Sequence, residues 1–399
     1  MQKHLVIIGA GAAGLPVASQ VRKKNKDIDI TVITDRKYFA YSPCGIPFVF
    51  SGMITSFDTL VLRDKKYYSE MDINILNETT VDKIDLDTNE IFFGNEKLKY
   101  DTLVIATGAK PIIPPIPGIN LEGIYFLNSL EDALKISDAL KNTKSPTIIG
   151  AGAIGLEMAH AFLKKGLKSR LIEMKDRVLP NMLDKDMSNI VEDYLSSLNM
   201  NVHTSTVASS FIGSKEVTHV KANGNEFETD LVLVSVGVRP NVELAKNAGI
   251  ETGITGAIVT DASLRVRRHG KYLKNVYACG NCIEVTDIIT HKSTISALGS
   301  TAIRQGVLVA DNILGKNSVF GSISSPSIAV IGELEVGTVG ITKERALEYG
   351  ISPIEGNAKG LTRAKYYPRG EDIYVKILSD SDYRVIGAQV ISKEEVKGR

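Results

Sequence analysis

The sequence has few cysteines, no tryptophan, almost no net charge and no long hydrophobic run. Its 399 residues include three cysteines, which are too few for a disulfide framework and typical of a reducing compartment. Lysine and arginine number 47 against 46 aspartates and glutamates, a net charge of +1, so nothing indicates a nucleic-acid partner or a membrane surface. No apolar stretch is long enough to span a membrane. We therefore expect a cytoplasmic protein with neither kind of partner.

The spacing of the cysteines excludes a further class of site. Cys279 and Cys282 have the C-x-x-C form, but no second pair exists and no histidine lies close to them. A zinc site needs four such ligands, so we expect no bound metal, and the role of the pair stays open. The apolar run Leu5–Val21 mimics a signal peptide, although its glycines and the helical pattern that follows explain it better.

The N-terminus has the pattern of a dinucleotide-binding unit. Leu5–Ile8 is a short apolar run typical of a buried parallel strand, and the G-x-G-x-x-G loop Gly9–Gly14 follows at once. A helix is expected next, with Pro16 in its first turn, and then a strand over Ile30–Ile33. Asp35 follows Gly14 by 21 positions, where an acid takes the ribose hydroxyls.

The same pattern occurs a second time. Thr147–Ile149 leads into Gly150–Gly155, a helix is expected over Leu156–Lys165 and a strand over Arg170–Ile172, and Glu173 follows Gly155 by 18 positions. Each unit also has a later apolar strand that ends at a glycine, Leu103–Gly108 in the first and Leu231–Gly237 in the second. The repeat predicts two dinucleotide-binding domains.

Between the first unit and its closing strand lies the segment Tyr41–Pro47, which contains Cys44. Pro43 disfavours helix for Ser42, and Gly45 permits a sharp turn, so we place Cys44 at or near the start of the next helix. Exposed N–H groups there would lower the pKa of the thiol and make it reactive. The alternative is a buried, inert cysteine.

The remaining sequence indicates a discontinuous α/β organisation. Prolines crowd Pro111–Gly118 and mark a domain boundary, and a long helix is expected from about Ser296 to Leu314. From about Ser325 the pattern changes to antiparallel strands with one helix near Lys343–Tyr349. We predict an α/β protein with two Rossmann-like domains and a smaller, shortened C-terminal α+β domain. The expected boundaries are 1–112 with 244–324 for the first domain, 113–243 for the second and 325–399 for the third.

Two dinucleotide sites indicate electron transfer between a flavin and a nicotinamide. A cysteine near the flavin would be the next carrier. Because Cys44 has no partner cysteine in its segment, it would form a mixed disulfide with a substrate thiol, a persulfide or a sulfenic acid.

These motifs, in this order, resemble the pyridine nucleotide-disulfide oxidoreductase family over essentially the whole chain. The segment Ser42–Pro47 is similar to the single-cysteine group of coenzyme A-disulfide reductases and NADH oxidases. The resemblance implies a homodimer with FAD and NADH or NADPH. FAD would contact Gly9, Gly11, Ala12, Ala13, Gly14, Asp35, Arg36, Val81, Ala106, Thr107, Gly108, Gly280, Asn281, Ala297 and Ala302.

The resemblance places NAD(P)H on the second loop. The residues implied are Gly150, Gly152, Ala153, Ile154, Gly155, Glu157, Glu173 and Gly237. Glu157 would lie near the nicotinamide and Glu173 at the ribose, where a carboxylate repels a 2′-phosphate and favours NADH. The nearby cations Lys175 and Arg177 leave NADPH as an alternative to NADH.

The resemblance also implies catalytic and substrate residues. Tyr366 and Tyr367, from the partner subunit, would reach Cys44 and act on its proton, the alternative being ordinary packing on a strand. Coenzyme A phosphates would meet basic residues late on the first helix, the alternative being a solvated helix face. The substrate residues are Gln20, Arg22, Lys23 and Ser42.

Some positions depart from the group's pattern. Asn281 replaces an aspartate, and Ala40, Pro43 and Ile303 differ from residues common in the group. The expected function is reduction of a disulfide at Cys44 by NAD(P)H through FAD, most like a coenzyme A-disulfide reductase. The alternatives are an NADH oxidase that reduces oxygen, a sulfur or polysulfide reductase, and a flavin redox sensor with little turnover.

Overall fold

The computed structural model describes residues 3–394 and 396 of the chain. It divides into two compact units, each described here by itself. Unit 1 comprises Met1–Ser42, Asp58–Lys110 and Val238–Ile323, and unit 2 comprises Pro43–Phe57, Pro111–Gly237 and Ser324–Arg399. The predicted mixed α/β class is confirmed. The predicted boundary between the second and third domains lies inside unit 2, and the division into three domains stays a prediction.

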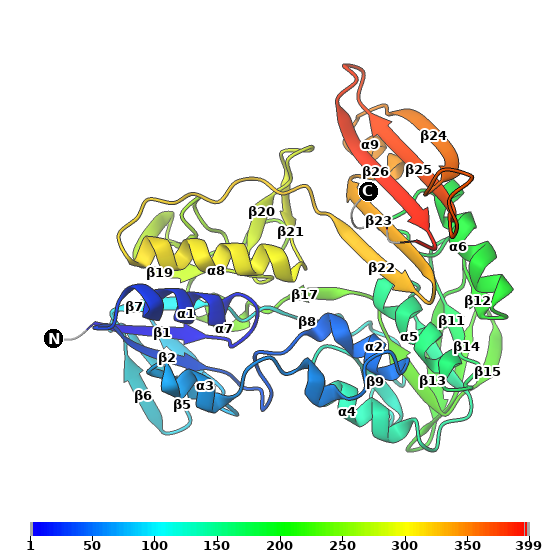
Figure 1. The fold of residues 1–399 in the computed structure, drawn as a ribbon. Helices are drawn as coiled ribbons and strands as arrows, with labels where there is room; N and C mark the ends of the chain where they lie inside the picture. Colours follow the sequence, from blue (N-terminus) through cyan, green and yellow to red (C-terminus); the bar gives the residue numbers. More distant parts are fainter. Residues whose placement is uncertain (1–2, 395, 397–399) are drawn as a thin grey trace. The chain divides into compact units, whose positions relative to one another are not determined.

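Unit 1 is built on a six-stranded sheet in the order β18-β19-β7-β1-β2-β3 (Figure 1). Its four central pairs are parallel, and only β18 and β19 run antiparallel. The central strands are continuously apolar because both faces of the sheet are covered, as in Leu5–Ile8. The strands are β1 (His4–Ile8), β2 (Asp29–Ile33), β3 (Ile73–Leu76), β7 (Thr102–Ile105), β18 (Arg265–Arg268) and β19 (Lys271–Ala278).

Helices α1 (Gly14–Lys24) and α8 (Gly299–Ile313) pack against each other along the sheet of unit 1 (Figure 1). Their contact is close because Gly306 has no side chain: a Cβ there would lie 2.3 Å from the carbonyl oxygen of Ala13. Helix α8 is shorter than the predicted Ser296–Leu314, so Ala297 precedes it. The smaller elements are α3 (Lys65–Glu70), α7 (Glu243–Asn247), β4 (Lys83–Asp85), β5 (Glu90–Phe93), β6 (Glu96–Lys99), β8 (Ala109–Pro111), β17 (Val238–Pro240), β20 (Glu284–Thr286), β21 (Ser293–Ile295) and the 3-10 turn η2 (Phe57–Leu60).

Unit 2 repeats the parallel arrangement with five strands in the order β12-β11-β10-β16-β9. A separate three-stranded antiparallel sheet, β13-β14-β15, contributes Phe211, Val217 and Val220 to its core. The parallel strands are β9 (Ile124–Phe126), β10 (Pro146–Ile149), β11 (Arg170–Ile172), β12 (Asn201–His203) and β16 (Leu231–Val234). The other elements of this part are η1 (Pro43–Gly45), α2 (Ile46–Phe50), α4 (Leu130–Ala139), α5 (Ala153–Lys164), α6 (Lys185–Ser197), β13 (Ala208–Gly213), β14 (Val217–Ala222) and β15 (Asn225–Glu228).

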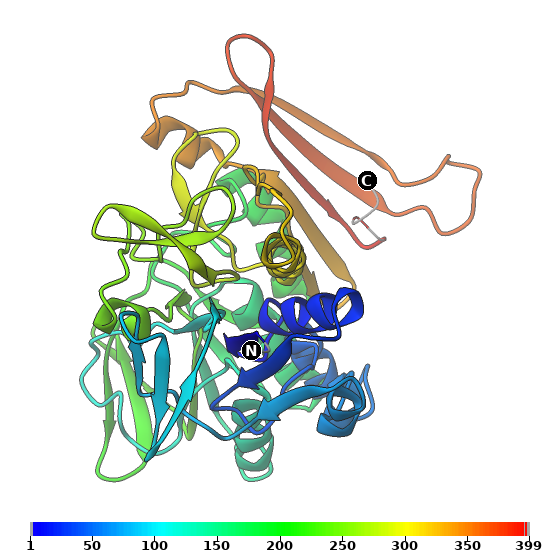
Figure 2. The same cartoon turned by 90° about the vertical axis from the view of Figure 1, so that its left-hand side faces the viewer.

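The C-terminal part of unit 2 is a five-stranded antiparallel sheet in the order β22-β23-β26-β25-β24 (Figure 2). The sequence did not predict β24, whose eight residues are all exposed and show no hydrophobic alternation. The elements are β22 (Ser327–Ile331), β23 (Leu334–Gly340), α9 (Lys343–Glu348), β24 (Ile354–Leu361), β25 (Asp372–Ser379) and β26 (Val385–Ser392). Every helix in the described part of the chain is too short or too polar to cross a membrane.

Candidate cofactor and cysteine sites

The first glycine loop, between β1 and α1, is shaped by backbone contacts that leave no room for side chains. Gly9 has a φ of +112°, and a Cβ there would lie 2.1 Å from the carbonyl oxygen of Ala106. A Cβ on Gly14 would lie 2.0 Å from the carbonyl oxygen of Gly9. Gly11 is exposed and a Cβ on it would meet nothing within 4 Å, so its side of the loop is open to a ligand.

The second loop, between β10 and α5, has the same geometry. Gly150 has a φ of +103°, and a Cβ there would lie 2.4 Å from the carbonyl oxygen of Ser235. A Cβ on Gly155 would lie 2.0 Å from the carbonyl oxygen of Gly150, and a Cβ on Gly152 would meet nothing within 4 Å. In both loops the first and third glycines therefore leave no room for a side chain, and the second glycine has open space beside it.

Backbone hydrogen bonds fix which residues correspond after the second strand of each unit. Gly9 N–H donates to the carbonyl of Ile33 at 2.7 Å, and Gly150 N–H donates to that of Ile172 at 2.8 Å. Ile33 thus corresponds to Ile172, and the next residue in each unit is Thr34 in the first and Glu173 in the second. We predicted Asp35 and Glu173 to be the equivalent acids of the two units, whereas in the structure Glu173 corresponds to Thr34 and Asp35 comes one residue later.

Asp35 and Glu173 accordingly lie in different surroundings. Asp35 is exposed and its carboxylate is 3.7 Å from the guanidinium of Arg36. Glu173 is 8% exposed, and its two carboxylate oxygens accept hydrogen bonds from the backbone N–H groups of Ala151 at 2.7 Å and Lys175 at 2.8 Å. The Glu173 carboxylate therefore fastens the second glycine loop to the end of β11. Their roles at the two riboses stay predictions.

Both loops fit a pyrophosphate. Neither α1 nor α5 has a side chain that caps its first N–H groups, which leaves those groups available to an anion. In unit 1, Gly280 has a φ of +86° and donates its N–H to the Oε1 of Gln305 at 2.7 Å. The Nε2 of the fully buried Gln305 has no protein partner among the described residues, which fits a bound group that supplies an acceptor.

The other predicted cofactor residues differ in their exposure and contacts. In unit 1, the hydroxyl of Thr107 donates to the carbonyl of Asn241 at 2.6 Å and so orients the Thr107–Gly108 turn. Val81, Ala106 and Ala302 are buried, Asn281 is partly exposed, and Ala297 and Ala12 are exposed. In unit 2, Ala153 and Ile154 open α5, and Gly237 has a φ of +107°.

Cys44 lies in the 3-10 turn η1, directly before α2, as predicted. It is exposed, whereas Cys279 and Cys282 are buried free thiols. The predicted lowering of its pKa is wrong. Protein atoms that partly desolvate the sulfur raise the pKa of Cys44, and the carboxylate of Glu157 raises it further, while a backbone hydrogen bond offsets this in part.

Glu157 lies on the first turns of α5, a helix that packs against α2. Its Oε1 accepts a hydrogen bond from the backbone N–H of Val330 at 3.1 Å. Burial raises the pKa of Glu157 to about 7, so its charge changes in the neutral range. Unit 2 therefore brings a titrating carboxyl close enough to Cys44 to act on the charge of its sulfur.

The predicted coenzyme A residues on α1 do not all face solvent. Arg22 is 3% exposed, and its guanidinium donates to the carbonyls of Asn25, Lys26, Ile28 and Asp72. It ties the end of α1 to neighbouring loops and is not available to a phosphate, so this prediction is wrong. The remaining three keep at least partial exposure, with Lys23 exposed and Gln20 and Ser42 intermediate.

Tyr366 and Tyr367 lie in the loop between β24 and β25, which extends from the end of the sheet (Figure 2). Tyr366 is 89% exposed and Tyr367 is 52% exposed, with the guanidinium of Arg363 5.2 Å from the Tyr367 ring. The alternative of ordinary strand packing does not hold for Tyr366. Both rings are free to contact another molecule.

A cleft of about 720 Å³ in unit 2 is lined by Arg177 but by none of the other residues predicted for the cofactor and cysteine sites. Its lining includes Lys376, 2% exposed, whose ammonium lies 3.1, 2.9 and 2.8 Å from carboxylates of Asp184, Asp186 and Glu355. The Lys376 ammonium is thus paired with three carboxylates, which indicates a structural role for this lysine.

Sequence reasoning missed Gln305 and Thr34. Gln305 gives no motif signal, since it is one polar residue on an otherwise amphipathic helix. Thr34 could have been found by aligning the two repeats on their strand ends instead of their glycines.

Comparisons with known proteins agree with this geometry. A family model described as pyridine nucleotide-disulphide oxidoreductase matches residues 3–306, and that family's dimerisation domain matches residues 326–397. An NADH oxidase from Methanocaldococcus jannaschii is 41% identical over 402 residues, covering 99% of this chain and 88% of the relative. A CoA-dependent NAD(P)H sulfur oxidoreductase from Pyrococcus furiosus is 33% identical over 399 residues, covering 98% and 89%. An NAD-dependent persulfide reductase from A. fulgidus superposes with a TM-score of 0.94 at 36% identity, covering 98% of this chain and 74% of that one.

Proposed function

Because this chain belongs to the pyridine nucleotide-disulphide oxidoreductase family, and is therefore an oxidoreductase that uses FAD and NAD(P)H, we propose that it reduces a sulfur–sulfur bond at Cys44. Cys44 carries the proposal: it is exposed at the start of a helix, while the other two cysteines are buried. The acceptor is a small-molecule disulfide such as coenzyme A disulfide. The CoA-dependent relative and the persulfide reductase support this class of acceptor.

The two loops divide the cofactors between them. We assign FAD to the loop Gly9–Gly14 with the Thr107–Gly108 turn and Gly280, and NAD(P)H to the loop Gly150–Gly155 with Glu157 and Glu173. Bound FAD supplies a two-electron carrier between a nicotinamide and a sulfur. The open sides of Gly11 and Gly152 support dinucleotide binding at both loops, because a pyrophosphate needs a close approach to the backbone there.

At Cys44 the chain supplies the nucleophile. Its thiolate attacks one sulfur of the acceptor disulfide, a new sulfur–sulfur bond forms and the first thiolate leaves. Two electrons that originate from NAD(P)H then break the mixed disulfide, release the second thiolate and restore Cys44. Glu157 is placed to hold or give up a proton near this sulfur as the charge on it changes.

The C-terminal sheet carries the family's dimerisation domain. We propose a homodimer in which Tyr366 or Tyr367 of one subunit approaches Cys44 of the other and donates a hydrogen bond to its thiolate. The 89% exposure of Tyr366 in a single chain supports this, because a ring so exposed is available to contact a second subunit.

A second candidate is reduction of oxygen, which the name of the 41% identical relative supports. In that reaction Cys44 would cycle through a sulfenic acid. Polysulfide is a third acceptor that would use the same thiolate chemistry as a disulfide.

Substitution of Cys44 tests the proposal. In Cys44→Ser, NADH-dependent reduction of coenzyme A disulfide should fall at least about a hundred-fold, because serine cannot form the mixed disulfide. Turnover should be measured on coenzyme A disulfide, polysulfide and oxygen in parallel. The buried Cys279 and Cys282 serve as the internal control. Because they are inaccessible, the folded Cys44→Ser variant should take up no iodoacetamide. Unchanged disulfide reduction would refute the role of Cys44, and a loss confined to oxygen turnover would favour the oxidase.

A further inference from the structure

The segment that follows β11 carries two cations beside the position proposed for the NAD(P)H ribose. Lys175 and Arg177 lie two and four residues after Glu173. Cations at this place would attract the 2′-phosphate of NADPH, and a carboxylate would repel it. Whether the chain accepts NADPH therefore depends on what these two side chains contact.

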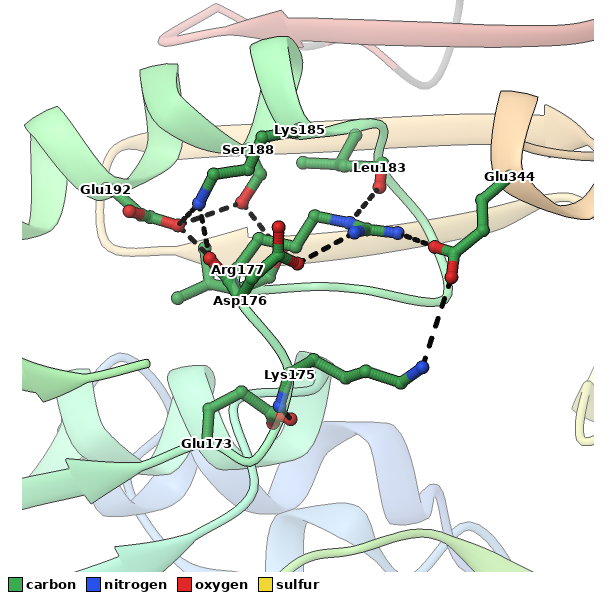
Figure 3. Close-up of polar contacts among 10 residues, drawn as sticks. Glu173, Lys175, Asp176, Arg177, Leu183, Lys185, Ser188, Glu192 and Glu344 are labelled. Atoms are coloured by element: carbon green, nitrogen blue, oxygen red, sulfur yellow. Dashed lines mark hydrogen bonds and ion pairs between the residues drawn. The ribbon is translucent and has the colours of Figure 1, made fainter. Parts of the chain in front are cut away.

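Arg177 is not available to a ligand. It is 8% exposed, and its guanidinium donates from Nε to the carbonyl of Leu183 at 3.2 Å and from Nη1 to Asp176 at 2.8 Å. Its Nη2 is paired with the Oε2 of Glu344, which comes from α9 of the C-terminal sheet region (Figure 3). Each of the three guanidinium nitrogens therefore has a protein partner.

Lys175 is turned toward the same carboxylate. Its backbone N–H is held by Glu173, while its side chain extends away from Glu173 and places the ammonium 4.0 Å from the Oε1 of Glu344 (Figure 3). The Lys175 side chain is about half exposed, and its ammonium is paired with Glu344. One carboxylate thus engages both cations of the segment.

We propose that Glu344 is a specificity-determining residue that favours NADH over NADPH from outside the nucleotide-binding fold. Its carboxylate pairs with Arg177 and Lys175 and so reduces the positive charge that a 2′-phosphate would meet beside Glu173. The inference rests on the proposed NAD(P)H site and goes beyond it, because it assigns the choice of phosphate to a residue of α9.

Glu344→Gln tests this with little change to the structure. The amide oxygen of glutamine can still accept from Arg177, but the charge that holds Lys175 is removed. Binding is measured by titration calorimetry with adenosine 2′,5′-bisphosphate and with 5′-AMP as probes of the ribose position. We expect the variant to bind the bisphosphate about three- to ten-fold more tightly than the native protein, with the affinity for 5′-AMP unchanged.

Three comparisons accompany that measurement. Glu348→Gln, on the same helix one turn later and exposed, should leave both affinities unchanged. Adding Lys175→Met to Glu344→Gln should abolish the gain, because the freed ammonium causes it. The gain should shrink as ionic strength rises, which a merely structural role of Glu344 would not produce.

Lys175→Met alone keeps the proposal testable if α9 tolerates no change. We expect it to weaken binding of the bisphosphate less than two-fold, since Lys175 is already engaged by Glu344. A several-fold loss in that variant, or no gain in Glu344→Gln, would overturn the inference while 5′-AMP still bound. If native protein bound neither 5′-AMP nor NADH, the proposed site itself would be wrong, and the inference would fall with it.

Discussion

The two glycine loops have almost the same backbone and different chemistry around it. Each begins with a glycine at φ near +100° that lies against a backbone carbonyl, and each has an open second glycine. Contacts of 2.0 to 2.4 Å require glycine at the first and third glycine positions of each loop, which explains why both sequences repeat those two. The similarity is enforced by steric exclusion between backbone segments.

The differences lie at positions that the backbone leaves free. Where unit 2 has Glu173, unit 1 has Thr34, and where α5 has Glu157, α1 has Pro16. A Cβ on Gly306 of α8 would lie 3.1 Å from the Cβ of Pro16, so that position is apolar and packed. Glu157 instead accepts from Val330 and acts on Cys44. At these two positions the first unit thus has uncharged side chains and the second has ionisable ones.

The largest expected effect tests whether the two loops are equivalent. Gly9→Ala and Gly150→Ala should each lower the free energy of unfolding by at least about 3 kcal/mol, because each forces a Cβ against a carbonyl oxygen at positive φ. Urea unfolding of each variant measures this. Gly356→Ala on exposed β24, where a Cβ meets nothing within 4 Å, is the control. If only one loop variant lost stability, the loops would not be equivalent.

A smaller effect tests how the acids differ. Glu173→Gln should lower the free energy of unfolding by about 2 kcal/mol, since the amide nitrogen faces one of the two N–H groups that the carboxylate now satisfies. Asp35→Asn should leave stability nearly unchanged, because that carboxylate is exposed. Thermal unfolding of both variants measures the change in stability. Equal losses of stability in the two variants would show that the two acids have the same role.

The smallest effect concerns Glu157 and Cys44. Above about pH 7 Glu157 is ionised and its negative charge disfavours the Cys44 thiolate, while below about pH 6 it is neutral. In Glu157→Gln the pKa of Cys44 should therefore be lower, and iodoacetamide should react about two- to three-fold faster at pH 8, with no difference at pH 6. Glu348→Gln is the control. A rate increase that was the same at both pH values would contradict the charge mechanism.

The sequence by itself determined the two nucleotide-binding units, the place of Cys44 before a helix and the α/β class. These depend on local features of the sequence. They are the apolar runs of strands buried on both faces, the glycines required in tight turns, and the proline before Cys44 that disfavours helix at the preceding residue. The assignment of FAD and NAD(P)H to particular residues came from the family resemblance.

Only the tertiary structure decided which polar groups remain free to act. Arg22 and Arg177 look like phosphate ligands in sequence, yet carbonyls and carboxylates from distant segments occupy both. The pKa of Cys44 rises where helix position alone predicted a fall, because partial desolvation of the sulfur and the charge of Glu157 outweigh a backbone hydrogen bond. Charge and desolvation depend on neighbours brought together in space, which no local spacing records.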